Sequence, residues 1–383
     1  MSKVTVESKL PYIGTSIFTV MTALARQHGA LNLAQGFPDF PADPKLLELV
    51  HQAMRDGHNQ YAPAPGIMAL REAISNLAVA CYSAEYNPDT EVTVTSGATE
   101  ALYCAITSTI REGDEVIVFE PAYDSYVPVI ELCGGIPVYI SLEFPEYKIN
   151  WEMVKKQVNS RTRMIILNSP HNPSGAILSS QDMKELAKIV QANPIVILSD
   201  EVYEHIIFDG LEHQSIARYP ELAERSFIVS SFGKTFHTTG WKTGYCLAPE
   251  YMMREFRKVH QFITFSTSHP FQVALAAYMK DPTRITELAS FYQKKRDFFQ
   301  SVIRESRFKA LNCSGTYFQL LDYSAISDEK DVDFAKRMTE EFKLAAIPVS
   351  VFYHGGEDNK VLRFCFAKEL ETMDRAAEIM LKM

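Results

Sequence analysis

The sequence lacks the features typical of secreted, membrane-spanning and metal-binding proteins. Its six cysteines are scattered without CxxC spacing, and together with ten histidines they match no zinc or iron ligand pattern. No apolar run approaches the ~18 residues needed to cross a bilayer. The first residues, MSKVTVESKLPYIG, have no apolar core of the kind found in a signal peptide. We therefore expect a cytoplasmic protein with reduced cysteines, no membrane contact and no metal-dependent chemistry.

Basic charge and nucleotide-binding glycines are also scarce. Thirty-eight Lys and Arg residues stand against 47 Asp and Glu residues, and the resulting net charge of −9 argues against nucleic-acid binding. No GxGxxG follows a β-rich run, so a dinucleotide site has no support. Apolar residues, in contrast, make up 46% of the chain, which is enough for a large core, and the length of 383 residues predicts two domains.

Short β-rich runs alternate with helical stretches over residues 89–249. Buried strands are expected at 115–119, 136–140, 164–167, 195–198 and 227–229, and helices at 99–111 and 181–191. Continuous Val and Ile runs with helices between them predict an α/β fold, in which helices cover both faces of a mostly parallel sheet. Residues 250–280 look mostly helical, and the β-formers at 308–323 and 347–366 predict a smaller α+β domain.

Polar and charged residues directly follow three of the expected strands. Asn168 and Asp200 come after the third and fourth strands, and Lys234 lies after the fifth, in the segment SSFGKTFHTTGWKTGY. Ligands of parallel sheets bind outside the carboxyl ends of the strands. A lysine among hydroxyls and glycines, with no glutamate beside it, is not a typical surface lysine. The turn TSGAT before residue 100 adds free N–H groups at a helix start, so the pattern predicts a phosphorylated cofactor.

Each feature alone also has a plain structural explanation. The TSGAT turn and Asp200 could simply cap helices, and residues 168–175 could form an ordinary Pro/Asn/Gly turn. Arg363 could reach a surface carboxylate. His171 could act as a base, although its proline-flanked loop favours local packing. The order and spacing of the features together, rather than any one of them, decide between these explanations.

That order resembles the class I/II aminotransferases, which are pyridoxal-phosphate enzymes of fold type I. The motifs that carry the resemblance are NPSG (172–175), DEVY (200–203), SFGK (231–234) with GWKTG (240–244), and LRFCF (362–366). The resemblance extends from residue 32 to residue 366. QGFPDF (35–40), NQYAP (59–63) and PVSVF (348–352) are most similar to the branch of methionine and kynurenine/glutamine aminotransferases.

The resemblance implies a pyridoxal 5′-phosphate site with a role for each matched residue. Lys234 would carry the cofactor covalently and, once released, move the substrate's proton. Asp200 would keep the ring nitrogen protonated, Tyr203 and Asn172 would bond the ring's 3-oxygen, and Tyr123 would stack on the ring. The phosphate would be held by Gly97, Ala98, Thr99, Ser231 and Lys242, and by Tyr61 of the neighbouring subunit. Many family members have arginine where this chain has Lys242. The lysine supplies the same charge but not the bidentate fork of arginine.

The same resemblance implies the substrate contacts and the assembly. Arg363 would clamp the α-carboxylate, helped by Gly36 and Asn172, and Phe18 would be one aromatic wall of the side-chain pocket, together with Tyr61, Tyr123 and Phe352. A homodimer with shared sites is expected, because Tyr61 would serve the other subunit. The domains expected are a large cofactor-binding domain, 41–280, with a mostly parallel seven-stranded sheet, and a small α+β domain of 1–40, which includes an N-terminal arm, and 281–383.

The activity expected is transfer of an amino group from methionine or another large neutral or aromatic amino acid to a 2-oxo acid. A cysteine-conjugate β-lyase is the alternative, because one fold supports several reactions. A non-catalytic binding module is disfavoured, because Lys234, Asp200 and Arg363 are all present and the chain has no DNA-binding extension. The sequence does not identify the preferred amino donor, the acceptor or the pathway.

Overall fold

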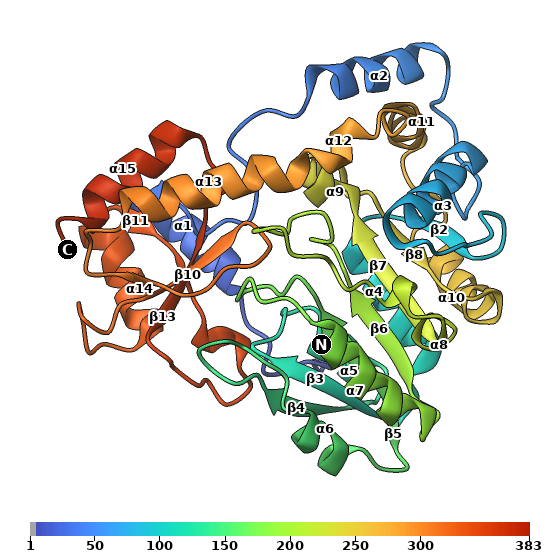
Figure 1. Ribbon diagram of the computed structural model, residues 1–383, viewed down its shortest axis with the longest axis horizontal. Coiled ribbons are helices and arrows are strands. Elements are labelled where there is room, and N and C mark those ends of the chain that lie inside the picture. Colours follow the sequence, from blue (N-terminus) through green and yellow to red (C-terminus); the bar gives the residue numbers. More distant parts are fainter. Residues whose placement is uncertain (1–4) are drawn as a thin grey trace, which may run out of the picture.

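The computed structural model describes residues 5–383, and its two main sheet regions lie side by side (Figure 1). The larger sheet has seven strands in the order β2-β8-β7-β6-β5-β3-β4. Their bounds are β2 (Val92–Thr95), β3 (Glu115–Glu120), β4 (Ile136–Ser141), β5 (Thr162–Asn168), β6 (Val196–Asp200), β7 (Ser226–Ser231) and β8 (Gly244–Leu247). Strands β4, β3, β5, β6 and β7 pair in parallel, while β8 lies antiparallel between β2 and β7.

Helices cover both faces of this sheet, as the continuous apolar strands predict. Val116 and Val118 of β3 pack with residues of α4 (Ala98–Thr109), α5 (Tyr126–Leu132) and α10 (Glu250–Ile263). Ile117, between them, belongs to the core on the other face, with residues of α6 (Trp151–Gln157) and α7 (Ser180–Gln191). Successive side chains of a strand point to opposite faces, so an all-apolar strand needs a core on each side.

The remaining helices of this part lie beside the sheet. They are α2 (Pro44–Arg55), α3 (Met68–Tyr82), α8 (Pro220–Ala223), α9 (Phe232–Thr235), α11 (His269–Tyr278) and the 3-10 turns η1 (Ile216–Arg218) and η2 (Thr239–Trp241). Helix α2 packs against α11, far along the chain (Figure 1). Its start is set by Asp43, whose side chain accepts the Lys45 N–H, and by Pro44 in the first turn. Among residues 5–383, no helix is both long and apolar enough to span a bilayer.

The smaller region is built around a four-stranded antiparallel sheet, β12-β13-β10-β9. Its elements are α1 (Ile17–His28), β1 (Leu31–Asn32), α12 (Thr283–Thr286), α13 (Leu288–Val302), β9 (Lys309–Ala310), β10 (Phe318–Asp322), α14 (Asp331–Glu341), β11 (Leu344–Ala345), β12 (Ile347–Pro348), η3 (Ser350–Phe352), β13 (Val361–Cys365) and α15 (Leu370–Met380). Strand β1 pairs with β11, so the N-terminal segment joins the C-terminal part of the chain.

The α/β fold and its mostly parallel sheet are confirmed, and all five predicted strands are present within a few residues. The prediction was wrong about the burial of residues 136–140. Strand β4 is an edge strand of the sheet, and Ile136 at its start is 44% exposed. An apolar run alone does not distinguish an edge strand from a central one, because the difference lies in how many neighbours pair with it.

Candidate active site

The carboxyl ends of β5, β6 and β7 meet at one edge of the sheet, and a cavity opens there. Asn168 and Asp200 are register partners across β5 and β6, and Ser231 ends β7. The cavity has roughly 670 Å³ of empty space, part of it open to solvent. Ten of the predicted site residues line it: Gly97, Ala98, Thr99, Tyr123, Asn172, Asp200, Tyr203, Ser231, Lys234 and Lys242.

Lys234 reaches the cavity from α9, the single helical turn that follows β7. Its Nζ donates to the Tyr317 hydroxyl at 3.0 Å and lies 3.5 Å from the Gly36 carbonyl oxygen. The Tyr317 hydroxyl in turn donates to that carbonyl at 2.6 Å. Burial lowers the pKa of Lys234 to about 8, and the Arg363 and Lys242 cations act in the same direction. A lysine with this pKa is present as the nucleophilic neutral amine for about a tenth of the molecules at pH 7.

Asp200 is a buried carboxylate that faces the same cavity. Its Oδ2 accepts from the Tyr126 hydroxyl at 2.6 Å and its Oδ1 from the Val202 N–H at 3.3 Å. Burial raises the pKa of Asp200 to about 6, although the hydrogen bonds from Tyr126 and Val202 oppose the shift. A buried anion favours a cationic partner. The site therefore fits a protonated ring nitrogen of the expected cofactor.

The start of α4 offers positive charge and free hydrogen-bond donors, which an anionic group requires. No side chain caps this helix, so its first N–H groups are free to bind an anion. Gly97 has a φ of +78°, and a Cβ added there would lie 3.3 Å from the Lys242 Nζ. Gly244 of β8 packs closely against this turn, because a Cβ added at Gly244 would lie 2.9 Å from the Ala98 nitrogen. With the Ser231 hydroxyl also lining the cavity, this donor set fits a phosphate.

Arg363 borders the cavity from strand β13 of the smaller region. It is 1% exposed, its Nη1 donates to Asn172 Oδ1 at 2.7 Å, and its Nη2 donates to the Ala34 carbonyl at 3.1 Å. The guanidinium lies 3.9 Å from the centre of the Phe318 ring and 5.2 Å from that of Phe18. Such a cation, with its plane fixed by hydrogen bonds and aromatic rings, is suited to bidentate binding of a carboxylate.

Four predicted residues do not line the cavity, and one of them, Arg363, borders it as described. Gly36 lies at its border through its carbonyl, and Phe18 contacts the arginine as described. Tyr61 is 82% exposed and packs edge-on against Phe265, with ring centroids 5.4 Å apart. Within a single chain, therefore, Tyr61 is on the surface rather than in the site.

The sequence reasoning missed two tyrosines that hold the principal groups. Tyr126 orients Asp200 through its hydroxyl. In the sequence, only its position three residues after Tyr123 could have indicated a role in the site. Tyr317, which contacts Lys234, is fully buried among apolar residues and gave no signal at all.

His171 proves to be a packing residue rather than a base. Its Nε2 donates to the Pro121 carbonyl at 3.0 Å, and its Nδ1 pairs with the Ser174 hydroxyl at 2.7 Å. Burial lowers the pKa of His171 to about 4. Since both ring nitrogens are engaged within the protein, neither is available to a substrate.

Comparison with known proteins gives matches along nearly the whole chain. Residues 29–380 match the family model described as aminotransferase class I and II. The chain is 48% identical over 373 residues to the methionine aminotransferase of Escherichia coli strain K12, with 97% of each chain covered. It is 34% identical to the kynurenine–oxoglutarate transaminase of Dictyostelium discoideum, with 97% of this chain and 94% of that one covered.

A solved structure gives the same result. The chain superposes on the crystal structure of YbdL from Escherichia coli, described as having a methionine aminotransferase function, with a TM-score of 0.97. Sequence identity is 46%, and 100% of both chains is covered. The β-lyase alternative gains no support, because each of these relatives is described as an aminotransferase or transaminase.

Proposed function

The chain belongs to the class I and II aminotransferases, and we propose that it moves the α-amino group of methionine, or of another large neutral or aromatic amino acid, to a 2-oxo acid. Pyridoxal 5′-phosphate, the cofactor of this family, supplies an electron sink for the negative charge left when the substrate loses its α-proton. The observation that carries the substrate proposal is Arg363, a buried guanidinium walled by aromatic rings.

Arg363 binds and orients the substrate through its α-carboxylate. Its guanidinium offers two parallel N–H donors, and Asn172 and Ala34 fix the plane in which they point. Phe18 and Phe352, whose ring centroids are 5.9 Å apart, provide apolar surface next to this carboxylate site. Among residues 5–383, no arginine lines the cavity itself, and Arg363 reaches its border through Asn172.

Lys234 moves the proton. Its neutral amine takes the proton from the substrate's Cα, and the hydrogen bond to Tyr317 limits where the amine can lie. Asp200, with a pKa of about 6, is an anion at pH 7 and so would favour protonation of the cofactor's ring nitrogen. Tyr126 holds that carboxylate in place.

The remaining cavity residues hold the cofactor. The N–H groups of the turn, the Ser231 hydroxyl and the Lys242 ammonium would bind its phosphate. Tyr123 would stack on its ring, and Tyr203 and Asn172 would donate to its 3-oxygen. These assignments are supported by the common lining of one cavity: Gly97, Ala98, Thr99, Tyr123, Asn172, Tyr203, Ser231 and Lys242.

We further propose a homodimer in which Tyr61 contributes to the other subunit's site. Support comes from an apolar patch around Tyr61, where Phe262 is 87%, Phe265 51% and Ile263 46% exposed in the single chain. Apolar patches of this kind mark interfaces between proteins. We also propose the cytoplasm as the compartment, since the six cysteines are free thiols. The proposed domain division, 41–280 against 1–40 and 281–383, is supported by the separate sheets and by the β1–β11 pairing.

Steady-state kinetics with methionine, phenylalanine and aspartate and one common 2-oxo acid test the substrate proposal. Placing the side-chain carboxylate of aspartate against Phe18 and Phe352 without a cationic partner would cost several kcal/mol. A flexible thioether would instead gain about 0.3–1.5 kcal/mol from each ring edge it contacts. We therefore expect kcat/KM to be highest for methionine and phenylalanine. A value for aspartate equal to theirs would refute the proposal.

A further inference from the structure

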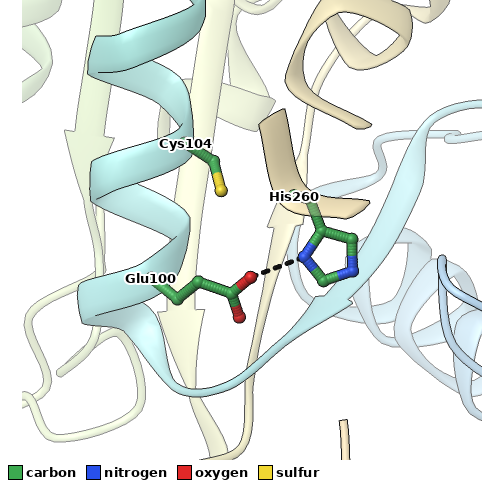
Figure 2. Close-up of side chains that lie close together, drawn as sticks. All are labelled: Glu100, Cys104 and His260. Carbon is green, nitrogen blue, oxygen red and sulfur yellow. Dashed lines mark hydrogen bonds and ion pairs between the residues drawn. The ribbon is translucent and has the colours of Figure 1, made fainter. Parts of the chain in front are cut away.

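A hydrogen-bonded chain of four residues lies behind the turn that precedes α4. The Ser96 N–H donates to one oxygen of the Glu100 carboxylate, and the other oxygen pairs with His260 Nδ1 at 2.6 Å. The second ring nitrogen, Nε2, lies 2.7 Å from the Ala64 carbonyl. Figure 2 shows the His260 ring, from the last turn of α10, pointing at Glu100 in the first turn of α4. Both residues are buried, with His260 only 1% exposed.

The partners determine the net charge of this pair. The Ala64 carbonyl can only accept, so Nε2 carries a hydrogen. The 2.6 Å contact between Nδ1 and the carboxylate requires one more proton between them, because two bare acceptors would repel each other. Whether that proton lies on His260 or on Glu100, the pair as a whole is neutral. His260 therefore cancels the negative charge that Glu100 alone would place there.

This cancellation matters because of where Glu100 lies. The N–H groups at the start of α4 are the proposed phosphate site, and Glu100 is in the first turn of the same helix. A carboxylate in the first turn is favoured by the helix dipole, but here it would stand close to a phosphate dianion in a buried site. The Glu100 carboxylate also holds the Ser96 N–H, so it supports the shape of the turn.

The same group of side chains superficially resembles a metal site. Glu100, Cys104 and His260 form the single cluster of possible metal ligands found within residues 5–383. However, both carboxylate oxygens and both ring nitrogens are already engaged within the protein. Burial, with the nearby Glu100, raises the pKa of the Cys104 thiol well above its usual value, so no thiolate is available. Hydrogen bonding explains this cluster without a metal.

We propose that His260 is a positioning residue for the cofactor phosphate: it neutralises Glu100, so that Glu100 can hold the Ser96–Thr99 turn without repelling the phosphate. The proposal rests on the proposed role of that turn. His260 also ties the turn to Ala64, three residues beyond Tyr61, and so links this subunit's phosphate turn to the segment proposed to contact the other subunit's phosphate.

Equilibrium binding of two ligands to the cofactor-free protein tests this role. Pyridoxal 5′-phosphate carries the phosphate, and pyridoxal does not. In His260→Leu, Glu100 is left as an unpaired anion, and we expect the Kd for pyridoxal 5′-phosphate to rise about tenfold or more. The Kd for pyridoxal should change by less than about threefold, because it brings no second negative charge. The absorbance change on binding reports both values, independently of turnover.

A second substitution separates charge from structure. In Glu100→Gln/His260→Leu, the amide oxygen can still accept the Ser96 N–H, but the negative charge is gone. We expect this double variant to recover pyridoxal 5′-phosphate binding to within about threefold of the wild type. Cys104→Ala is the matched control, since it removes the third side chain of the cluster without touching the pair, and its Kd should not change. If His260→Leu is insoluble, His260→Gln, which brings no charge, should show the same selective loss.

Three results would overturn the inference. One is a Kd for pyridoxal 5′-phosphate in the His260 variants that stays within about threefold of the wild type. Another is an equal loss for pyridoxal, which would indicate general damage to the site. The third is a double variant that remains as weak as the single one. A wild-type protein that binds pyridoxal as tightly as its phosphate ester would instead refute the proposed phosphate site itself.

Discussion

Replacing Arg363 by lysine tests the substrate clamp while keeping its charge. The arginine uses Nη1 for Asn172 and Nη2 for Ala34, and it lies 3.9 Å from the centre of the Phe318 ring. A lysine has one nitrogen in place of the planar fork and cannot offer two parallel donors. The substrate carboxylate would then keep one charge-assisted hydrogen bond instead of two.

The expected loss follows from that one bond. A hydrogen bond to a charged group contributes about 1.5–3 kcal/mol, which corresponds to a fall of about 10- to 150-fold in kcat/KM. The lost stacking on Phe318 acts in the same direction, because the guanidinium is fully desolvated there. The effect should be similar for methionine and phenylalanine, since both present the same carboxylate.

Steady-state kcat/KM for methionine is the measurement, with Arg71→Lys as the matched control. Arg71 is also buried, and its guanidinium bonds the Gly66 and Pro88 carbonyls, but it does not line the cavity. We expect the control to stay within about threefold of the wild type. The assignment of the clamp would be refuted if kcat/KM of Arg363→Lys also stayed within about threefold of the wild type, or if kcat/KM of the control fell as far as that of Arg363→Lys.

The other predictions concern charge, assembly and packing. Asp200→Ala should lower kcat by roughly 100-fold or more at saturating cofactor, and a near-normal kcat would limit Asp200 to a structural role through Tyr126 and the Val202 N–H. Mixing inactive Tyr61→Ala and Lys234→Ala proteins should restore part of the activity through hybrid dimers, and none after verified subunit exchange would contradict shared sites. Tyr317→Phe should lower the melting temperature by a few degrees, because the hydroxyl bonds Lys234 and a backbone carbonyl. Tyr292→Phe is its control, since that hydroxyl has no partner within residues 5–383 and its loss should leave the melting temperature unchanged.

The sequence predicted best what depends on local order. Strand ends could be recognised from apolar runs, and parallel pairing brings such ends together, so the order of residues along the chain was enough to predict that Asn168, Asp200 and Lys234 are neighbours. The resemblance added Arg363, which lies in another sheet and which no periodicity would connect to Lys234.

Pairings between distant side chains could not be predicted in this way. Tyr126 and Asp200 are 74 positions apart, and Glu100 and His260 are 160 apart. Each of these side chains, viewed alone, resembles an ordinary residue of a buried helix or strand. Only the packing of the elements that carry them shows which polar atoms meet, and a single sequence contains no record of that packing.

The position of β8 has a consequence for the order in which the protein is made. Within residues 5–383, this strand is the only neighbour of β2 in the sheet, and its Gly244 packs against the turn that starts α4. Residues 96–243 must therefore be synthesised before β2 gains a partner, and residue 247 completes the pairing. At typical elongation rates, roughly 8–30 s pass between the synthesis of β2 and that of β8. The turn proposed to bind the phosphate lies in the first third of the chain but is completed late, so we expect that the cofactor cannot stabilise a nascent chain until more than half of it has been synthesised.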